Sequence, residues 1–298
     1  MSSKQNLTTV FNKESGEIHL GGIDALVRLT LDQVRTDERR GLKTGMFVSG
    51  YRGSPVGMLD AALIKQQKLL LEHNIKFVDG LNEDLAATAV WGTQMMHTVG
   101  KQKFDGVTGM WYGKAPGVDR SGDALKHANY TGIGKNGGVL AVVGDDPSCK
   151  SSSLASQSEP MLFHVGMPSL YPGNVQEILD LGLHGYNMSR LSGLWVGMKI
   201  VTNVADGTGT ANIDPSRLNF VTPDLMFDGQ KFTPNMNLGM NVRVEALEME
   251  QSLYTRRLEV AKRYARENKP NNVVFPNPNA WLGTMTAGKT YNELQQAL

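Results

Sequence analysis

The residues of this chain that could do chemistry gather where short apolar runs give way to polar, glycine-bearing stretches. The most informative stretch is 80–89, GLNEDLAATA, where Glu83 follows the apolar pair Phe77-Val78 and opens an alanine-rich helical segment. Asn82 has the side chain of a helix N-cap. Because an acid in a first turn complements the helix dipole, Glu83 taken alone would be an ordinary helix-start glutamate.

Three further segments have the same form, an apolar strand followed by a polar loop. They are 45–55 (GMFVSGYRGSP), 110–124 (MWYGKAPGVDRSGDA) and 138–152 (GVLAVVGDDPSCKSS), and the first leads into a helix expected over 58–71. Strands that alternate with helices predict an α/β fold, a mostly parallel sheet with helices on both faces. Such sheets bind ligands at the carboxyl ends of their strands, so the four loops should meet at one edge.

In order along the chain, these motifs resemble the N-terminal pyrimidine-binding domain of the 2-oxoacid:ferredoxin oxidoreductases, and most closely the fused-chain indolepyruvate ferredoxin oxidoreductases. The matching segments are GGIDALVRL at 21–29, YRGSP at 51–55, LNED at 81–84, the segment 114–125 and GDDPSCKSS at 144–152. The resemblance covers nearly the whole chain. It implies a thiamine diphosphate-binding fold of pyrimidine type. It also implies oxidative decarboxylation of an aryl 2-oxoacid to an acyl-CoA, with electrons passed through iron–sulfur clusters to ferredoxin.

The resemblance gives Glu83 a catalytic role. In the family a glutamate at this position hydrogen-bonds N1′ of the thiamine pyrimidine, so that the cofactor's own 4′-imino group can take the proton from the thiazolium C2. The small and apolar residues Leu85, Ala86, Ala87 and Ala89 would suit a poorly solvated pocket around this carboxyl, and they would equally suit an ordinary packed helix.

The resemblance also assigns substrate binding to Ser54 and Arg52. Ser54 stands where the family's Tyr-Pro-x-Thr-Pro loop has its hydroxyl, and we expect it at the start of a helix, where backbone donors favour an anion. Arg52 replaces a proline of that loop, and two alternatives stay open: a clamp on the substrate carboxylate, or an outward ion pair with an acid such as Asp60. The resemblance further implies cofactor binding by Tyr51, Gly53, Asn82, Lys114 and Asp119.

The remaining parts of such an enzyme are missing from the sequence. A diphosphate and its magnesium need a Gly-Asp-Gly motif followed by paired asparagines, and the nearest approach, Asp206-Gly207 with Asn235 and Asn237, has the composition of an ordinary loop. We expect no metal site in this chain. Cys149 is its one cysteine, whereas an iron–sulfur cluster needs four thiolates.

Thiamine diphosphate would therefore be shared with a partner. The resemblance implies that magnesium and the iron–sulfur clusters lie in a diphosphate-binding, cluster-bearing domain or subunit, that ferredoxin accepts the electrons, and that the enzyme is an oligomer. The isolated chain is expected to be inactive.

Composition narrows the class of partner. The 298 residues include 30 basic and 29 acidic side chains, which leaves no charge excess to attract nucleic acid or an acidic membrane. The first residues lack the apolar core of a signal peptide, and no stretch approaches the ~20 apolar residues of a membrane span. A lone cysteine is compatible with a reducing compartment. We expect a cytoplasmic protein.

The chain divides into three expected parts: a pyrimidine-binding domain at 1–205, a crossing segment and charged helix at 206–270, and the truncated start of a following domain at 271–298. Within them, hydrophobic periodicity predicts a helix over 175–191, a strand over 195–204 and a helix over 243–269. The packed stripe of the last helix would contain Leu247, Leu253, Leu258, Ala261 and Tyr264. In the family, a strand that ends in Ala-Gly-Lys and is followed by a helix opens the next domain, so the resemblance implies a strand that ends at 287–289 and a helix after it.

Two other functions fit the same sequence. The chain could be a non-catalytic remnant or assembly module of this fold, or it could belong to a thiamine-dependent decarboxylase or transferase without iron–sulfur clusters. A partner with ferredoxin-type cysteine clusters would favour the oxidoreductase over the last of these.

Overall fold

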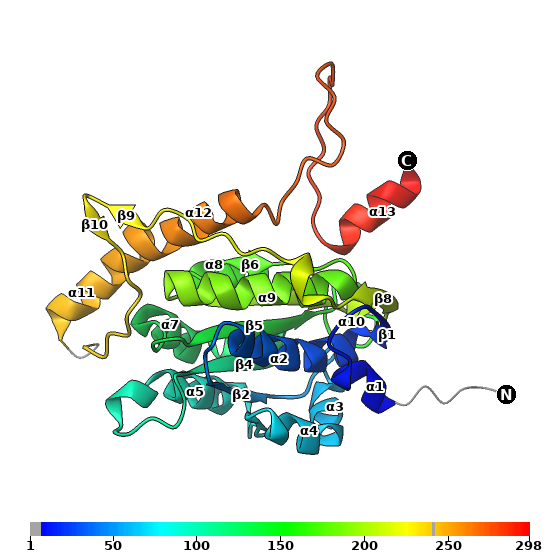
Figure 1. The fold of residues 1–298 in the computed structure, drawn as a ribbon. Helices are drawn as coiled ribbons and strands as arrows, with labels where there is room; N and C mark the ends of the chain where they lie inside the picture. Colours follow the sequence, from blue (N-terminus) through cyan, green and yellow to red (C-terminus); the bar gives the residue numbers. More distant parts are fainter. Residues whose placement is uncertain (1–6, 240–241) are drawn as a thin grey trace.

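A six-stranded parallel sheet forms the centre of the computed structural model, which describes residues 7–239 and 242–298 (Figure 1). The strand order is β3-β2-β4-β5-β7-β6, and every neighbouring pair is parallel. The strands are β2 (Thr44–Gly50), β3 (Ile75–Phe77), β4 (Gly106–Lys114), β5 (Gly138–Asp145), β6 (Ser169–Leu170) and β7 (Trp195–Val201). The predicted α/β fold class is confirmed.

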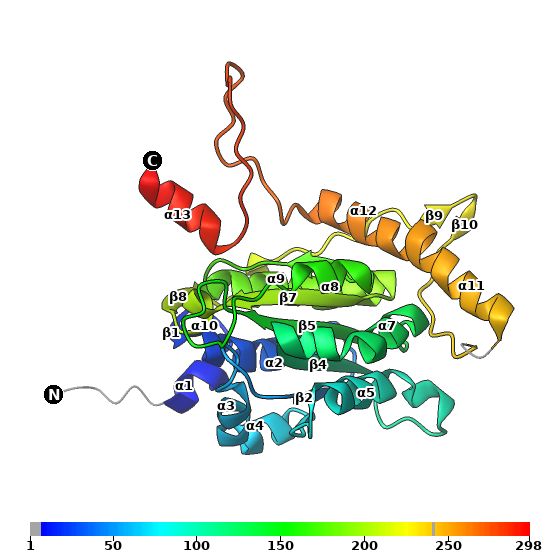
Figure 2. The same cartoon turned by 180° about the vertical axis from the view of Figure 1, so that it is seen from behind.

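Helices cover both faces of the sheet, as predicted (Figures 1 and 2). One face carries α2 (Gly22–Arg39), α3 (Leu59–Lys65), α4 (Gln67–Glu72) and α9 (Val175–Ser192), and the other carries α5 (Glu83–Gln94), α7 (Gly122–Thr131) and α8 (Glu159–His164). All residues of β5 and β7 are buried, which explains their nearly continuous apolar sequences. Alternate residues of β5 therefore join two different cores: Leu140 belongs to the α2–α9 side and Val139 to the α5–α7 side.

Several element boundaries differ from the predicted ones. The helix expected over 58–71 is two helices, α3 and α4, that meet at Gln66. The strand expected over 195–204 ends at Val201, because the chain turns there through the short helix α10 (Thr202–Ala205). It then forms β8 (Thr208–Asn212), which pairs antiparallel with β1 (Glu17–Gly21). That pair was not predicted.

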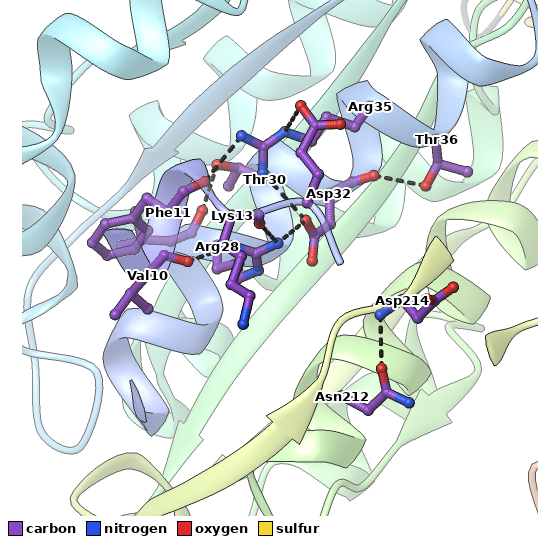
Figure 3. A network of polar contacts seen from close by, with 12 residues as sticks. Val10, Phe11, Lys13, Arg28, Thr30, Asp32, Arg35, Thr36, Asn212 and Asp214 are labelled. Carbon is purple, nitrogen blue, oxygen red and sulfur yellow. Dashed lines mark hydrogen bonds and ion pairs between the residues drawn. The ribbon is translucent and has the colours of Figure 1, made fainter. Parts of the chain in front are cut away.

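A buried ion network joins the first helix, α1 (Leu7–Asn12), to α2 (Figure 3). The Arg28 side chain is fully buried, donates to the carbonyl oxygens of Val10 and Lys13, and lies 3.1 Å from Asp32. Arg35 donates to the carbonyl oxygen of Phe11 at 2.9 Å. These bonds fasten the segment around residues 10–13 to the side of α2.

The expected charged helix over 243–269 is present in two parts, α11 (Arg243–Ser252) and α12 (Leu258–Asn268), with a π-helical turn at Leu253–Arg257 between them. Most of the predicted stripe is buried or partly buried, but Leu247 is 57% exposed, because α11 extends past the sheet while α12 packs over α9 (Figure 1). The preceding segment contains the turn η2 (Pro215–Arg217) and a hairpin of β9 (Met226–Phe227) and β10 (Gln230–Lys231).

The last part of the chain is partly as expected. An extended loop replaces the strand that was expected to end at 287–289, but the helix expected after it is present as α13 (Lys289–Ala297). The loop leads back to the body of the molecule, where the Asn292 side chain donates to the carbonyl oxygen of Gly173 at 3.0 Å. In the described ranges, no helix is long and apolar enough to cross a membrane.

Candidate active site at the carboxyl edge of the sheet

The loops that follow β2, β3, β4 and β5 meet at one edge, as predicted. The Gly80 amide donates to the carbonyl oxygen of Gly50, and the Tyr51 amide donates to that of Tyr112, both at 3.0 Å. A Cβ atom at Gly144, the second-last residue of β5, would lie 2.8 Å from the Pro55 ring. The segment 80–89, the 51–55 corner and the end of β5 are thus in direct contact.

Glu83 is the first residue of α5, and Asn82 caps that helix as predicted, since its side-chain oxygen accepts a hydrogen bond from the Leu85 amide at 2.9 Å. The glutamate is only 5% exposed. The Trp111 indole N–H donates to its backbone carbonyl at 3.0 Å and fixes the start of the helix against β4. These contacts hold the Glu83 side chain at the carboxyl edge of the sheet.

Two glycines make room for this side chain. A Cβ atom at Gly117, in the short helix α6 (Ala115–Arg120), would lie 2.6 Å from Cγ and 2.7 Å from Oε1 of Glu83. A Cβ atom at Gly113 would lie 3.5 Å from Cγ. Any larger residue at position 117 would therefore displace the carboxylate.

The carboxylate of Glu83 has no hydrogen bond and no ion pair to any other residue in 7–239 or 242–298. Its neighbour Asp84 differs, because it is partly exposed and pairs with Arg120 at 3.1 Å. A buried polar group without a partner is unfavourable until a ligand supplies a hydrogen bond. Glu83 is therefore a buried acid of this edge whose carboxylate is available to a bound molecule.

The predicted lining of the Glu83 pocket is half right. Ala86 and Ala87 are buried, but Leu85 is 51% exposed and Ala89 is also exposed. The helical repeat explains the error, because residues three, four and seven positions after Glu83 share its face, whereas those two and six positions after it lie on the opposite face. The buried face of α5 consists of Glu83, Ala86, Ala87, Val90 and Gln94.

The 51–55 corner lies beside this acid but does not open a helix at Ser54. The helix α3 begins only at Leu59, so the expected helix N-terminus at Ser54 is wrong. The Ser54 hydroxyl instead contacts the Ser151 hydroxyl of the loop after β5. Arg52 is exposed, and in the described parts of the chain it pairs neither with Asp60 nor with any other acid.

The residues expected to bind the cofactor fall into two groups. Gly53 and Lys114 are packed together, since a Cβ atom at Gly53 would lie 2.8 Å from Cδ of Lys114. Tyr51 is tied to the same place through its backbone bond to β4. Asn82 is occupied as the cap of α5, and Asp119 is exposed on α6, with no hydrogen bond or ion pair inside the described ranges.

Sequence reasoning missed the way in which the loop after β5 is built. The Asp146 carboxylate accepts hydrogen bonds from the amides of Ser151 at 2.8 Å, Lys150 at 2.9 Å and Ser152 at 3.0 Å. The bond from Ser151, followed by that from Lys150, lowers the pKa of Asp146 to about 2. They fold the loop over the corner and bring Ser151 to Ser54. An aspartate shortly before a run of serines was the available signal, because Asp side chains commonly accept bonds from nearby amides.

Metal ligands do not gather at this edge. In the part of the chain that the structure describes, no group of three His, Cys, Asp or Glu side chains could hold a metal ion. Cys149 is exposed in the loop after β5.

Comparison with known proteins gives related sequences and a related structure. No protein-family model matches the chain. It is 22% identical to the indolepyruvate oxidoreductase subunit IorA of Methanothermobacter thermautotrophicus. The aligned region of 286 residues covers 96% of this chain and 41% of the relative. The protein of the same name from Methanothermobacter marburgensis is 24% identical, with 87% and 39% covered. This chain thus spans about two fifths of the length of these relatives.

The related structure is a 2-oxoglutarate:ferredoxin oxidoreductase from Magnetococcus marinus, solved with 2-oxoglutarate, coenzyme A and succinyl-CoA bound. It matches with a TM-score of 0.61 at 14% sequence identity, over 95% of this chain and 51% of that one. The likeness shows a shared fold. Together with the related sequences, it confirms the predicted resemblance to the 2-oxoacid:ferredoxin oxidoreductases.

Proposed function

We propose that this chain is the pyrimidine-binding part of a thiamine diphosphate-dependent 2-oxoacid oxidoreductase. One observation carries the proposal: Glu83 is buried and unpartnered within the described residues, and it lies in a glycine-lined space at the carboxyl edge of a parallel sheet. The relatives support an oxidoreductase, and their names support an indolepyruvate-type, aryl 2-oxoacid substrate.

The residues at this edge fit the pyrimidine end of thiamine diphosphate. Glu83 would share a proton with N1′, and the glycines at 113 and 117 would leave space for the carboxyl to reach the ring. Bound thiamine diphosphate supplies a thiazolium carbon that becomes nucleophilic when its proton is removed. Only 5% of Glu83 is exposed, so few water molecules can compete for its carboxyl, and the low polarity around it would strengthen a hydrogen bond to the ring.

Substrate binding is proposed for the rim of the same edge. The hydroxyls of Ser54 and Ser151 lie together there, and the Lys114 side chain packs on the same corner and adds positive charge. Two hydroxyl donors and a cation can hold a carboxylate by charge-assisted hydrogen bonds. We therefore place the carboxylate of the 2-oxoacid next to these three residues.

The rest of the reaction needs other domains. Cys149 is the one cysteine of the sequence and cannot hold a cluster, and the chain spans about two fifths of its relatives. We infer that a diphosphate-binding, magnesium- and cluster-bearing partner or continuation completes an oligomeric, cytoplasmic enzyme, and that ferredoxin takes its electrons.

The test is proton exchange at the thiazolium C2 in the assembled enzyme, followed by NMR. Glu83→Gln keeps the shape of the side chain but cannot share a proton with N1′, so exchange should slow by on the order of 10² or more, as for loss of a positioned acid–base group. Binding of thiamine diphosphate should change much less. Asp84→Asn, one residue along the same helix, is the matched control and should leave exchange unchanged.

An unchanged exchange rate in Glu83→Gln would reduce this residue to a helix-start acid. Ferredoxin reduction separates the remaining functions. Turnover of a 2-oxoacid without reduction of ferredoxin would favour a cluster-free decarboxylase or transferase. Absence of both C2 exchange and turnover in the wild-type assembly would indicate a non-catalytic module.

A further inference from the structure

A cavity lined by three arginines lies on the α2–α9 side of the molecule, away from the candidate active site. It has a volume of about 160 Å³, and its walls come from the end of α2, from α9 and from the segment 215–220. The strand β2 begins at Thr44, just after α2, so the end of α2 lies at the amino edge of the sheet, opposite the edge where Glu83 lies. The lining residues are Thr36, Arg39, Arg40, Leu183, Pro215, Arg217, Leu218 and Phe220.

The polar groups of this cavity are cationic or neutral, and none of its lining residues is acidic. Arg39 donates to the Thr36 hydroxyl at 3.1 Å, and Arg40 donates to the Asn187 side chain at 3.3 Å. The Arg40 guanidinium also lies 5.0 Å from the centre of the Phe220 ring. Neutral partners thus orient both guanidinium groups without neutralising them.

Arg217 is the most buried of the three. Its Nε lies 2.7 Å from Asp180, its Nη1 donates to the carbonyl oxygen of Asp214, and its Nη2 is buried with no hydrogen-bond partner inside the described ranges. Because Nη2 is enclosed by protein and Asp180 balances the charge of Arg217, the positive charge open to a ligand is that of Arg39 and Arg40.

The acidic residues near the cavity do not neutralise Arg39 and Arg40 either. Arg28 and Arg35 share the single carboxylate of Asp32, at 3.1 and 3.6 Å (Figure 3). Asp37 is taken by Arg190 at 2.6 Å. Asp32 and Asp37 are therefore paired with arginines outside the cavity and Asp180 is paired with Arg217, so the charges of Arg39 and Arg40 remain.

We propose that this cavity binds a phosphate-bearing small molecule. The phosphate would accept hydrogen bonds from Arg39 and Arg40, since guanidinium groups match the geometry of phosphate oxygens. The apolar wall of Leu183, Leu218 and Phe220 would contact the organic part of the ligand. The cavity has the volume of about five water molecules at ~30 Å³ each, which suits a phosphate group and the atoms next to it.

Calorimetric titration of the 298-residue chain tests this proposal, with phenyl phosphate as the probe and ionic strength held constant. Benzoate and inorganic phosphate are comparison ligands, because the first has the ring with a single charge and the second has the phosphate without a ring. Saturable binding of phenyl phosphate, tighter than that of either comparison ligand, is expected. The double variant Arg39→Gln/Arg40→Gln should weaken it at least tenfold, given the strength of hydrogen bonds between charged groups.

Arg120→Gln is the matched control, since Arg120 is an exposed arginine on α6 that pairs with Asp84. This variant should bind phenyl phosphate as tightly as the wild type does. Arg39 and Arg40 are chosen over Arg217 because loss of Arg217 would leave Asp180 without its cation. The absence of saturable binding at millimolar phenyl phosphate would overturn the proposal, as would unchanged binding by the double variant. Equal affinity for benzoate would overturn the choice of phosphate, and equal affinity for inorganic phosphate would overturn the contact with the apolar wall.

Discussion

Asp32 and Glu83 are carboxylates buried to nearly the same extent, at 6% and 5% exposure, in opposite surroundings. Asp32, in the middle of α2, lies 3.1 Å from Arg28 and 3.6 Å from Arg35 (Figure 3). Glu83, at the start of α5, faces glycines and has no partner for its carboxylate in the described parts of the chain. The Asp32 carboxylate uses its interactions to support the fold, whereas the Glu83 carboxylate can still bind a ligand.

The chemistry around Asp32 is consistent with a structural role. Burial raises the pKa of this carboxyl, and the nearby guanidinium of Arg28, followed by that of Arg35, opposes the rise. The same arginines hold the carbonyl oxygens of residues 10–13. Asp32 therefore supplies the negative charge that allows two arginines to stay buried while they fasten α1.

The largest expected effect is on the stability of the Asp32 region. Asp32→Asn leaves the fully buried Arg28 without its counter-charge. Removal of one member of a buried ion pair costs about 3–5 kcal/mol, so the free energy of unfolding should fall by about that much in a urea titration of the chain. Asp228→Asn is the control, because it removes an exposed partner of Arg256 and should cost about 0–1 kcal/mol. Equal losses in both variants would mean that Asp32 supports the fold no more than an exposed acid does, and its contrast with Glu83 would then fail.

The next effect concerns the space around Glu83. In Gly117→Ala the new methyl group would lie 2.6 Å from Glu83 Cγ, so the carboxylate must move. A displacement of about 1 Å can cost on the order of 10² in rate, and C2 proton exchange in the assembled enzyme should slow by about that factor. Gly92→Ala is the matched control, because a Cβ atom there meets nothing within 4 Å on the same helix α5. Normal exchange in Gly117→Ala would mean that the position of Glu83 does not matter.

The two regions also differ in how far the sequence predicted them. The site edge was largely predictable, because strand ends, the Asn82 cap and the turn at Ser54-Pro55 are local patterns, and parallel strands bring their ends together. The contact between Ser54 and Ser151 was not, since it depends on how Asp146 folds its own loop.

The α2 side was much less predictable. Arg28, Asp32 and Arg35 have the helical spacing of ordinary surface charges, and nothing local shows that Arg28 and Arg35 bind the carbonyl oxygens of residues 10–13. The packing of α10 is also non-local. A Cβ atom at Gly22 would lie 2.0 Å from the carbonyl oxygen of Val204, so the start of α2 and the distant α10 can approach this closely only with a glycine at position 22. Contacts between distant parts of the chain do not change the hydrophobic periodicity of either part, so they cannot be predicted from it.

A smaller effect is expected at the rim of the Glu83 edge. Ser54→Ala removes one hydroxyl donor from the proposed carboxylate site and should raise the KM for the 2-oxoacid by about tenfold, as for a hydrogen bond to a charged group worth about 1.5 kcal/mol. Ser151→Ala should act in the same direction because the two hydroxyls are in contact. Steady-state kinetics of the assembled enzyme measure both. Arg52→Ala should raise KM only if its exposed side chain clamps the substrate.

Ser153→Ala is the control for these variants, since Ser153 is exposed in the same loop and, among the described residues, its side chain makes no hydrogen bond to Ser54. A Ser54 variant with the KM and turnover of the wild type would remove the 51–55 corner from the site. The proposal for Glu83 would stand, because it depends on C2 exchange and not on KM.

The smallest effect is a pH dependence of the loop after β5, where Asp146 provides a third kind of carboxylate. It accepts hydrogen bonds from the backbone amides of Ser151, Lys150 and Ser152, and the bonds from the Ser151 and Lys150 amides lower its pKa from an ordinary 3.8 to about 2. Because the folded loop prefers the ionised acid, its stabilisation is complete above the ordinary pKa and is lost as the pH falls through about 2. Amide hydrogen exchange, corrected for intrinsic rates, should therefore show protection of these three amides that declines between about pH 4 and pH 2. In Asp146→Asn the protection should be weaker at neutral pH and should not decline in this window. Protection that is the same in both proteins would mean that the amides do not hold this carboxylate, and Asp146 would then resemble the unpartnered Glu83 more than the paired Asp32.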